Sequence, residues 1–302
     1  MRKITEINIT KLWGDPDLNI HWKLNPDVNV LAGDNGSGKS TVLNLVAGLL
    51  HSEYKSETAQ KAESIEIIFE GGNTISFNQK DGFAAYQDFK KEYLREITIN
   101  ISTFDQDLIP HYKEIQEQTP SLETTRTTLD LELFEIKQNY ITYFNQIGSL
   151  AAEALFNNTA NATALKESVK IQLDKQNLFF DIIDKLFAHS QKTINRRGSE
   201  LYFTNNLKEK IKLHQLSSGE KQLLIILLTA LIRAEKPCIL MMDEPEMSLH
   251  PDWQRTLIDN IRTLNEQVQL IIATHAPLLI VNGWAGNVQQ MDKIITPKPI
   301  KS

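Results

Sequence analysis

Residues 33–40 read Gly-Asp-Asn-Gly-Ser-Gly-Lys-Ser, which matches the pattern G-x-x-x-x-G-K-[ST]. The context fits the pattern, because a predicted strand at residues 28–32 precedes it and an amphipathic helix follows it. Glycines in such a loop let backbone N–H groups point at an anion, and the positive end of the helix dipole adds to the attraction. The stretch therefore predicts a loop that cradles a polyphosphate.

The loop and the start of its helix supply the predicted phosphate and metal contacts. Lys39 is expected to reach the β- and γ-phosphates, and the Ser40 hydroxyl is expected to coordinate Mg²⁺ in preference to Thr41. The expected cofactors are ATP and Mg²⁺. The candidate nucleotide contacts are Asn35, Gly36, Ser37, Gly38, Lys39, Ser40 and Thr41.

Composition sets the broad class of the protein. The chain has 302 residues, 41% of them hydrophobic, which is enough for one large core or two lobes. Its single cysteine, Cys238, lies in an apolar run, so we expect no disulfide framework and a cytoplasmic protein. No apolar stretch is long enough to span a bilayer, so direct membrane insertion is not expected. The net charge of −6 disfavours a surface that binds nucleic acid everywhere but leaves a local basic patch open.

The pattern along the chain divides it into three segments. Residues 1–104 contain short β-like runs and the phosphate loop, with a hairpin turn at Glu70–Asn73. Residues 105–200 are compatible with long helices, broken near residues 157–161, and are predicted to form a helical insertion. In residues 201–302 strands alternate with helices, which predicts an α/β fold with a parallel sheet.

An acidic cluster follows a second predicted strand. The apolar run 238–242 ends in Asp243-Glu244-Pro245-Glu246, as expected for a buried strand whose carboxyl end delivers acidic groups. Asp243 is expected to hold Mg²⁺ through water, and Glu244 to orient or deprotonate the attacking water. His275 ends the next apolar run, where it is placed to contact the γ-phosphate; a capped surface histidine is the plainer alternative.

The segment 216–222, Leu-Ser-Ser-Gly-Glu-Lys-Gln, resembles the signature sequence of ABC ATPases. In that family two ATPase heads meet head to tail, and the signature of one subunit caps the γ-phosphate held by the other. The resemblance implies a homodimer in which Ser217 and Gly219 are the contacts across the interface. Gly219 also opens a predicted helix, whose start is a second anion site.

The acidic cluster and its surroundings identify the subfamily. Residues 243–254, Asp-Glu-Pro-Glu-Met-Ser-Leu-His-Pro-Asp-Trp-Gln, and 273–277, Ala-Thr-His-Ala-Pro, resemble the RecF- and OLD-like ATPases, often grouped as AAA-type ATPases of antiphage systems. Transporter ATPases usually have a different sequence here. The resemblance covers residues 1–104 and 201–285. It implies a P-loop NTPase fold of ABC type, with a mostly parallel sheet, an antiparallel β subdomain and a helical insertion lobe.

Three further assignments follow from this resemblance. The loop Ser248–His250 would couple the two sites of a dimer. Gln106, with Gln79 as the alternative, is the candidate glutamine that bridges Mg²⁺ and the attacking water. Trp13 lies at about the position of the family's adenine-stacking aromatic residue, although an aromatic residue at such a position is more often explained by simple packing.

The resemblance points to compact ATPases such as those of Septu and retron systems, whose effector is a separate chain, a nuclease or toxin. It implies a bacterial defence or DNA-processing complex. Two alternatives stay open: the ATP-binding subunit of a membrane transporter, and a scaffold that binds ATP and hydrolyses it slowly. DNA is a further candidate partner, through Arg196 and Arg197, which could also face a partner's acidic surface; a solvated turn is the plainer alternative for both.

Overall fold

The computed structural model describes residues 3–51, 59–85, 91–101, 127–156, 161–234 and 236–296. The chain divides into two compact units. The first unit comprises Met1–Ser102, Pro237–Glu246 and Val268–Ser302. The second unit comprises Thr103–Lys236 and Met247–Gln267. The phosphate loop therefore belongs to the first unit, and the signature segment to the second.

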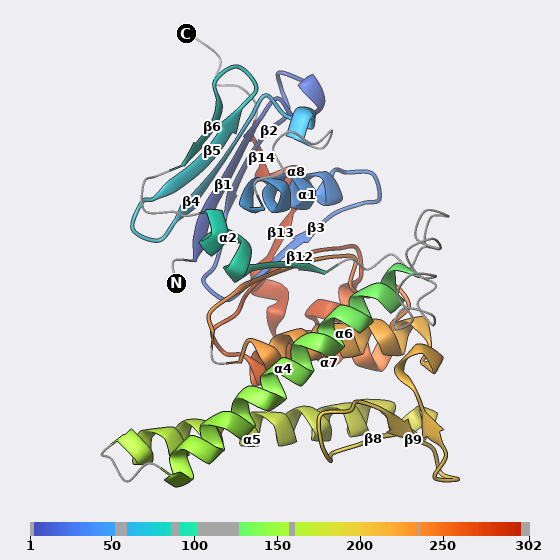
Figure 1. Cartoon of the computed structure of the whole chain (residues 1–302). Coiled ribbons are helices and arrows are strands. Elements are labelled where there is room, and N and C mark those ends of the chain that lie inside the picture. Colours follow the sequence, from blue (N-terminus) through green and yellow to red (C-terminus); the bar gives the residue numbers. More distant parts are fainter. Residues whose placement is uncertain are drawn as a thin grey trace, which may run out of the picture. The chain divides into compact units, whose positions relative to one another are not determined.

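A parallel sheet positions the acidic groups of the first unit (Figure 1). Within the described residues its strand order is β13-β3-β12-β11-β7. Strands β11 and β12 are apolar on both faces and almost completely buried, as is typical of a central parallel strand. The bounds are β3 (Val28–Ala32), β7 (Thr98–Ile101), β11 (Ile239–Asp243), β12 (Gln269–Thr274) and β13 (Val288–Gln290).

The register of this sheet brings several strand ends to one edge. Ala32 of β3 pairs with Thr274 of β12, and Ala273 pairs with Asp243 of β11. The phosphate loop, His275 and Glu244 each follow directly after these paired residues. Three segments that are distant in the sequence are thus adjacent in the first unit.

An antiparallel sheet forms the rest of the β structure of the first unit. Its order is β14-β2-β1-β4-β5-β6. The predicted turn at Glu70–Asn73 is confirmed: it joins β4 to β5, and Gly71 and Gly72 have φ values of 84° and 78°. The strands are β1 (Ile4–Thr10), β2 (Asn19–Lys23), β4 (Ser64–Phe69), β5 (Thr74–Asn78), β6 (Gly82–Ala85) and β14 (Ile295–Thr296).

Helix α1 (Lys39–Leu50) anchors the phosphate loop to the core of the first unit. As predicted, its apolar stripe is buried, and it packs with side chains of both sheets in one cluster. The stripe consists of Leu43, Val46, Ala47 and Leu50. The other short elements of this unit are η1 (Leu12–Gly14), η2 (Ala59–Lys61), α2 (Lys91–Ile97), η6 (Pro277–Ile280), η7 (Trp284–Asn287) and α8 (Met291–Ile294).

The second unit is mainly helical. Helices α4 (Thr128–Phe156) and α5 (Asn161–Leu186) form a long hairpin, in green and yellow in Figure 1. The break predicted near residues 157–161 falls largely outside the described residues. Helix α6 (Ser218–Ile232) is buried on nearly all sides, and α7 (Pro251–Leu264) packs against it. The remaining elements are η4 (Phe187–Ser190), β8 (Thr193–Ile194), β9 (Phe203–Thr204), β10 (Lys210–Ile211) and η5 (Leu213–Gln215).

Aromatic side chains hold the parts of the second unit together. Phe187 stacks between Phe203 and Trp253, with ring centroids 5.0 and 5.6 Å apart. The indole N–H of Trp253 donates to the carbonyl of Leu186 at 2.9 Å. These contacts fix the β8–β10 hairpins to α5 and α7, which precede and follow the signature helix in the sequence.

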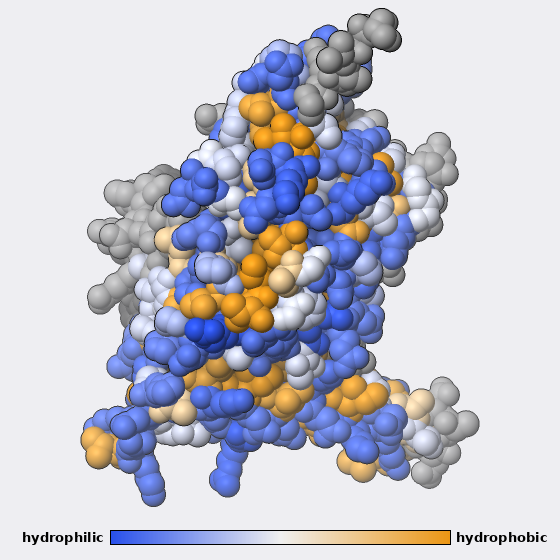
Figure 2. Space-filling model, turned by 180° about the vertical axis from the view of Figure 1, so that it is seen from behind, coloured by the Kyte–Doolittle hydropathy of each residue, from blue (hydrophilic) through white to orange (hydrophobic). Residues whose placement is uncertain are grey.

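The face drawn in Figure 2 is largely hydrophilic, with hydrophobic side chains in separate patches. Among the described residues, no helix combines the length and the apolar character needed to cross a membrane.

Candidate nucleotide site

Two glycines shape the phosphate loop between β3 and α1. Gly36 and Gly38 have φ values of 81° and 103°, a region that favours glycine. Gly38 is also crowded: a Cβ atom there would lie 2.8 Å from Cη2 of Trp13. The indole of Trp13 thus packs against the start of α1, and about half of this residue remains exposed.

Lys39 places its ammonium group inside the loop. Its side chain is buried, and Nζ donates to the carbonyl oxygens of Gly33 at 2.8 Å and Asp34 at 3.0 Å. The same nitrogen lies 3.6 Å from Oε1 of Glu244. The loop therefore contains a positive charge held by weak carbonyl acceptors, which phosphate oxygens can replace.

Ser40 and Asp243 meet beside Lys39. Burial raises the pKa of the Asp243 carboxyl, and a hydrogen bond with Ser40 opposes this shift. A hydroxyl beside a carboxylate is a pair of hard oxygen donors, the type that Mg²⁺ prefers. The Ser37 hydroxyl is buried and has no hydrogen-bond partner among the described residues, so it is available to a phosphate oxygen. The donor set therefore fits a triphosphate with Mg²⁺.

Glu244 occupies a strained position at the end of β11. Its φ of 50° lies in the left-handed region, which costs a non-glycine residue about 1–3 kcal/mol. Its backbone N–H donates to the carbonyl of Ala273 at 2.7 Å. Its carboxylate accepts hydrogen bonds from Nδ1 of His275 and, at 3.4 Å, from the His275 backbone N–H. The backbone is thus bent so that Glu244 faces His275.

The surroundings keep Glu244 ionised. Burial alone would raise the pKa of Glu244, but hydrogen bonds from Glu246 and His275 and attraction to His275 and Lys39 lower it. A charged carboxylate beside the phosphate loop is the state that a general base requires.

No site role is predicted for Glu246 from the sequence, where it is only part of the motif that indicates the subfamily. The structure places its side chain in the site. Its buried carboxyl accepts hydrogen bonds from the Thr274 hydroxyl and, at 3.3 Å, from the His275 backbone N–H. Burial, followed by the hydrogen bond with Glu244, raises the pKa of Glu246 to about 7. The sequence signal that could have indicated this role is the presence of an acidic residue three positions after Asp243.

These three side chains also have the composition of a metal site. Within the described part of the chain, Glu244, Glu246 and His275 are the one such group, with ligand atoms within 4.8 Å of one another. Two buried carboxyl groups this close together repel each other when both are charged, so a proton on one of them would stabilise the pair as a cation would.

A cavity of about 490 Å³ opens beside the ends of β3 and β12. Its lining includes Asn35 from the phosphate loop and His275. Both predicted residues therefore face space that a ligand could fill.

The signature segment begins α6 in the second unit. The Ser217 hydroxyl accepts the backbone N–H of Glu220 at 3.3 Å, and the Glu220 carboxylate accepts the N–H of Ser217 at 2.9 Å, which forms a capping box. A Cβ atom on Gly219 would overlap the carbonyl oxygen of Ser248. The predicted coupling loop, Ser248–His250, therefore packs against the signature glycine of the same chain.

Two ion pairs hold the first turn of α6. Lys192 Nζ lies 2.7 Å from both carboxylate oxygens of Glu220, and Lys221 Nζ lies 2.7 Å from Asp130 of α4. Glu220, Lys221 and Asp130 are buried. Ion pairs thus connect the signature helix α6 to α4 and to Lys192 within the second unit.

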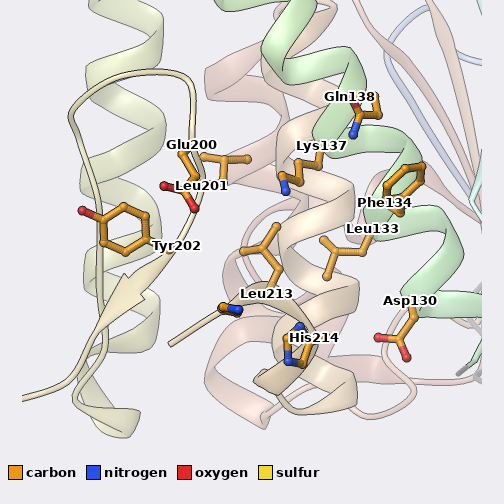
Figure 3. A pocket seen from close by; sticks show the side chains of 11 residues that line it. Asp130, Leu133, Phe134, Lys137, Gln138, Glu200, Leu201, Tyr202, Leu213 and His214 are labelled. Atoms are coloured by element: carbon orange, nitrogen blue, oxygen red, sulfur yellow. The ribbon is translucent and has the colours of Figure 1, made fainter. Parts of the chain in front are cut away.

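Asp130 of this ion pair also lines a second cavity, of about 400 Å³ (Figure 3). Leu133, Leu201 and Leu213 line it, and Asp130 and His214 lie at one end. Its wall includes η5, the element directly before the signature.

The remaining predicted residues have the following positions. Gln106 lies outside the described residues. The Gln79 amide donates to the carbonyls of Gln60 and Ala62 in the antiparallel sheet region, at 3.0 and 3.1 Å. Thr41 follows Ser40 in the first turn of α1.

Arg196 is already paired within the second unit. Its guanidinium lies 2.8 Å from Asp181 and 2.5 Å from Asp184 of α5. These contacts join the turn that contains Arg196 to α5.

Comparison with known proteins identifies relatives across most of the chain. The family described as "AAA domain, putative AbiEii toxin, Type IV TA system" matches residues 28–282. "Retron Vc95 probable ATPase" from Vibrio cholerae serotype O1 biovar El Tor is 27% identical over 224 residues, 70% of this chain and 42% of that protein. "Septu protein PtuA" from Bacillus thuringiensis is 22% identical over 313 residues, 93% of this chain and 73% of that protein. The chain thus spans less than half the length of the retron relative.

Solved structures of SMC heads share the fold. One SMC head, bound to the C-terminal winged-helix domain of ScpA, gives a TM-score of 0.52 at 12% identity, over 93% of this chain and 92% of that one. The SMC head domain from Thermotoga maritima gives 0.50 at 14% identity, over 95% and 94%. The predicted α/β fold, a P-loop NTPase fold of ABC type, is confirmed. Because the family match extends over residues 28–282, the chain belongs to this AAA-domain family, which confirms the predicted kinship with the AAA-type ATPases of antiphage systems.

Proposed function

We propose that this protein binds ATP with Mg²⁺ and hydrolyses it. The observation that carries this proposal is the convergence of phosphate-binding and acidic groups at one edge of the parallel sheet. The groups are Lys39, Ser40, Asp243, Glu244 and His275. Phosphoryl transfer to water needs little beyond positioning and charge stabilisation, and this set supplies both.

Each residue has a role that follows from its position. Lys39 exchanges its two carbonyl acceptors for phosphate oxygens. Ser40 and Asp243 would hold Mg²⁺, which when bound supplies positive charge to the phosphate oxygens. Glu244 accepts a proton from the attacking water. His275, bonded to Glu244 and facing the cavity, is placed to contact the γ-phosphate.

We further propose that two copies close head to tail around ATP, as the resemblance to ABC ATPases implies. Because the Ser217 oxygen accepts the Glu220 N–H, the hydroxyl hydrogen of Ser217 is left to donate to a phosphate oxygen. The start of α6 adds partial positive charge at the same point. The signature thus presents donors suited to the γ-phosphate of the second copy.

The relatives suggest the biological role. A retron ATPase and a Septu protein share most of this chain. We therefore propose that closure of the dimer controls a separate effector protein, a nuclease or toxin, in an antiphage defence complex.

Phosphate release by the purified protein tests the activity. The wild type should release phosphate from ATP in the presence of Mg²⁺ and lose this activity in EDTA. Glu244→Gln should lower kcat on the order of 10²-fold or more, the scale of general base catalysis, while ATP still binds. Equal rates for the wild type and Glu244→Gln would remove Glu244 as the base, and a wild type that does not bind ATP would refute the proposed function.

A further inference from the structure

One buried acid in the first unit has no role in the chemistry proposed above. Glu246 is 6% exposed, although an isolated charged carboxylate is costly to bury. Pro245 separates it from Glu244 in the sequence, yet the two carboxyl groups meet in space. Specific partners must therefore offset the free-energy cost of burying the Glu246 carboxyl group.

Partners of Glu246 lie at the end of β12. The Thr274 hydroxyl and the His275 backbone N–H both donate to Oε1 of Glu246. His275 in turn donates to Glu244 through its ring and its backbone. Glu246 thus lies beside Glu244, with ligand atoms of the two within 4.8 Å of each other, and it is hydrogen-bonded to the histidine that holds Glu244.

We propose that Glu246 is a positioning residue for hydrolysis: its neutral carboxyl donates a hydrogen bond to the charged carboxylate of Glu244 and fixes it in place beside His275. This inference rests on the proposed ATPase function. Glu246 itself does not touch the reacting atoms, so it acts through Glu244.

Electrostatics favours one proton on this pair. Two adjacent buried carboxylates repel each other, so one of them stays protonated. The His275 ring lies beside both carboxyl groups, and Asp243 precedes Glu244. The ammonium group of Lys39 lies 3.6 Å from Glu244, whereas the Thr274 hydroxyl and the His275 backbone N–H face Glu246. Lys39 therefore stabilises the charge on Glu244, which leaves the proton on Glu246.

The test compares two substitutions of Glu246. Glu246→Gln keeps an N–H donor for Glu244 and an oxygen acceptor for Thr274, so its kcat should stay within about threefold of the wild type. Glu246→Ala removes both contacts, and its kcat should fall on the order of tenfold to a hundredfold. KM and the Kd for ATP should change little in either variant, because neither contact is made to nucleotide. Glu266→Gln, at an exposed position in the second unit, is the control.

The pH profile separates positioning from a purely structural role. In the wild type, kcat should decline as Glu246 loses its proton, because the donor becomes a second negative charge beside Glu244. The groups that face this pair, Lys39, His275 and Asp243, are unchanged in Glu246→Gln, so loss of this alkaline decline would be due to Glu246 alone. Thr274→Val, which removes one donor to Glu246, should lower kcat by less than Glu246→Ala does.

The outcomes are distinct. Retained activity in Glu246→Gln, with a low kcat and normal ATP affinity in Glu246→Ala, supports the inference. Equal kcat values and equal pH profiles in all variants overturn it, as does a Glu246→Gln enzyme as slow as Glu246→Ala. If thermal denaturation shows that Glu246→Ala is not folded, the kcat values and pH profiles of Glu246→Gln and Thr274→Val decide the question. An inactive wild type would instead refute the proposed function.

Discussion

At the scale of single residues, Gly38 combines two constraints on the phosphate loop. Its φ of 103° strains any other residue, and Trp13 occupies the space of a Cβ atom. We therefore expect Gly38→Ala to lower the free energy of unfolding by about 2–6 kcal/mol, since strain and overpacking each cost about 1–3 kcal/mol. Urea denaturation measures this loss. Gly36→Ala is the matched control, because Gly36 has a similar φ of 81° and no neighbour within 4 Å.

The two causes can be separated. Trp13→Ala in the Gly38→Ala background should restore the part of the lost stability that is due to overpacking, but not the part due to strain. An equal loss in Gly36→Ala and Gly38→Ala would show that the contact with Trp13 is unimportant.

Much of the nucleotide site could be predicted from single residues. Lys39, Ser40, Asp243 and Glu244 were predicted because each stands in a short motif next to a predicted strand or helix, and the structure brings them together. The hydrogen bond from the Thr274 hydroxyl to Glu246 could not be predicted in this way. It depends on burial and on the register of β11 and β12, which are distant in the sequence.

At the scale of elements, Gly219 lets the signature helix α6 and the loop Ser248–His250 pack closely. Gly219→Ala places a Cβ atom onto the Ser248 carbonyl, so the loop must move. We expect a loss of about 1–3 kcal/mol in stability. Dimerisation in ATP should be lost, whereas ATP binding by the separate chain should persist, because the phosphate loop lies in the other unit.

Gly148→Ala is the control for this prediction. Gly148 lies in α4 of the same unit with open space around it, so alanine should stabilise the helix by up to about 1 kcal/mol. Light scattering and thermal denaturation measure the two effects. Normal ATP-dependent dimers of Gly219→Ala would contradict the assigned role of the loop.

The buried ion pair between α4 and α6 gives a second prediction for the elements. Lys221→Met leaves Asp130 without its cation, and loss of one partner of a buried pair costs about 3–5 kcal/mol. The double variant Asp130→Leu, Lys221→Met should recover most of this stability, because neither charge of this pair then stays buried. Urea denaturation of both variants checks this expectation, and a double variant as unstable as the single one would contradict it.

Long elements were easier to predict than short ones. The hairpin turn at Glu70–Asn73 and the buried stripe of α1 follow from glycine chemistry and from helical spacing. Strands β8, β9 and β10 have two residues each, too few for a periodic pattern, and tertiary contacts such as the Phe187–Phe203 stack position them. The ion pairs of the signature helix join segments that no local pattern relates.

At the scale of the whole molecule, the proposed dimer makes each site from two chains. The phosphate loop comes from one copy and the signature from the other, so a variant damaged in one element can complement a variant damaged in the other. Lys39→Ala should be inactive because the phosphates lose their cation. Ser217→Arg should be inactive because its side chain blocks the γ-phosphate position. Each of these two variants, measured by itself, should therefore hydrolyse no ATP.

An equal mixture of these two inactive variants should regain activity. A mixed dimer has one site with an intact Lys39 and an intact Ser217, and a second site that lacks both. If chains pair at random and sites act independently, about half of the dimers are mixed, and about a quarter of wild-type activity returns. Phosphate release by the mixture measures this recovery, and each variant mixed with itself is the control. A mixture as inactive as its parts would show that Ser217 does not complete the site of a second copy, because sites built within one chain cannot complement each other.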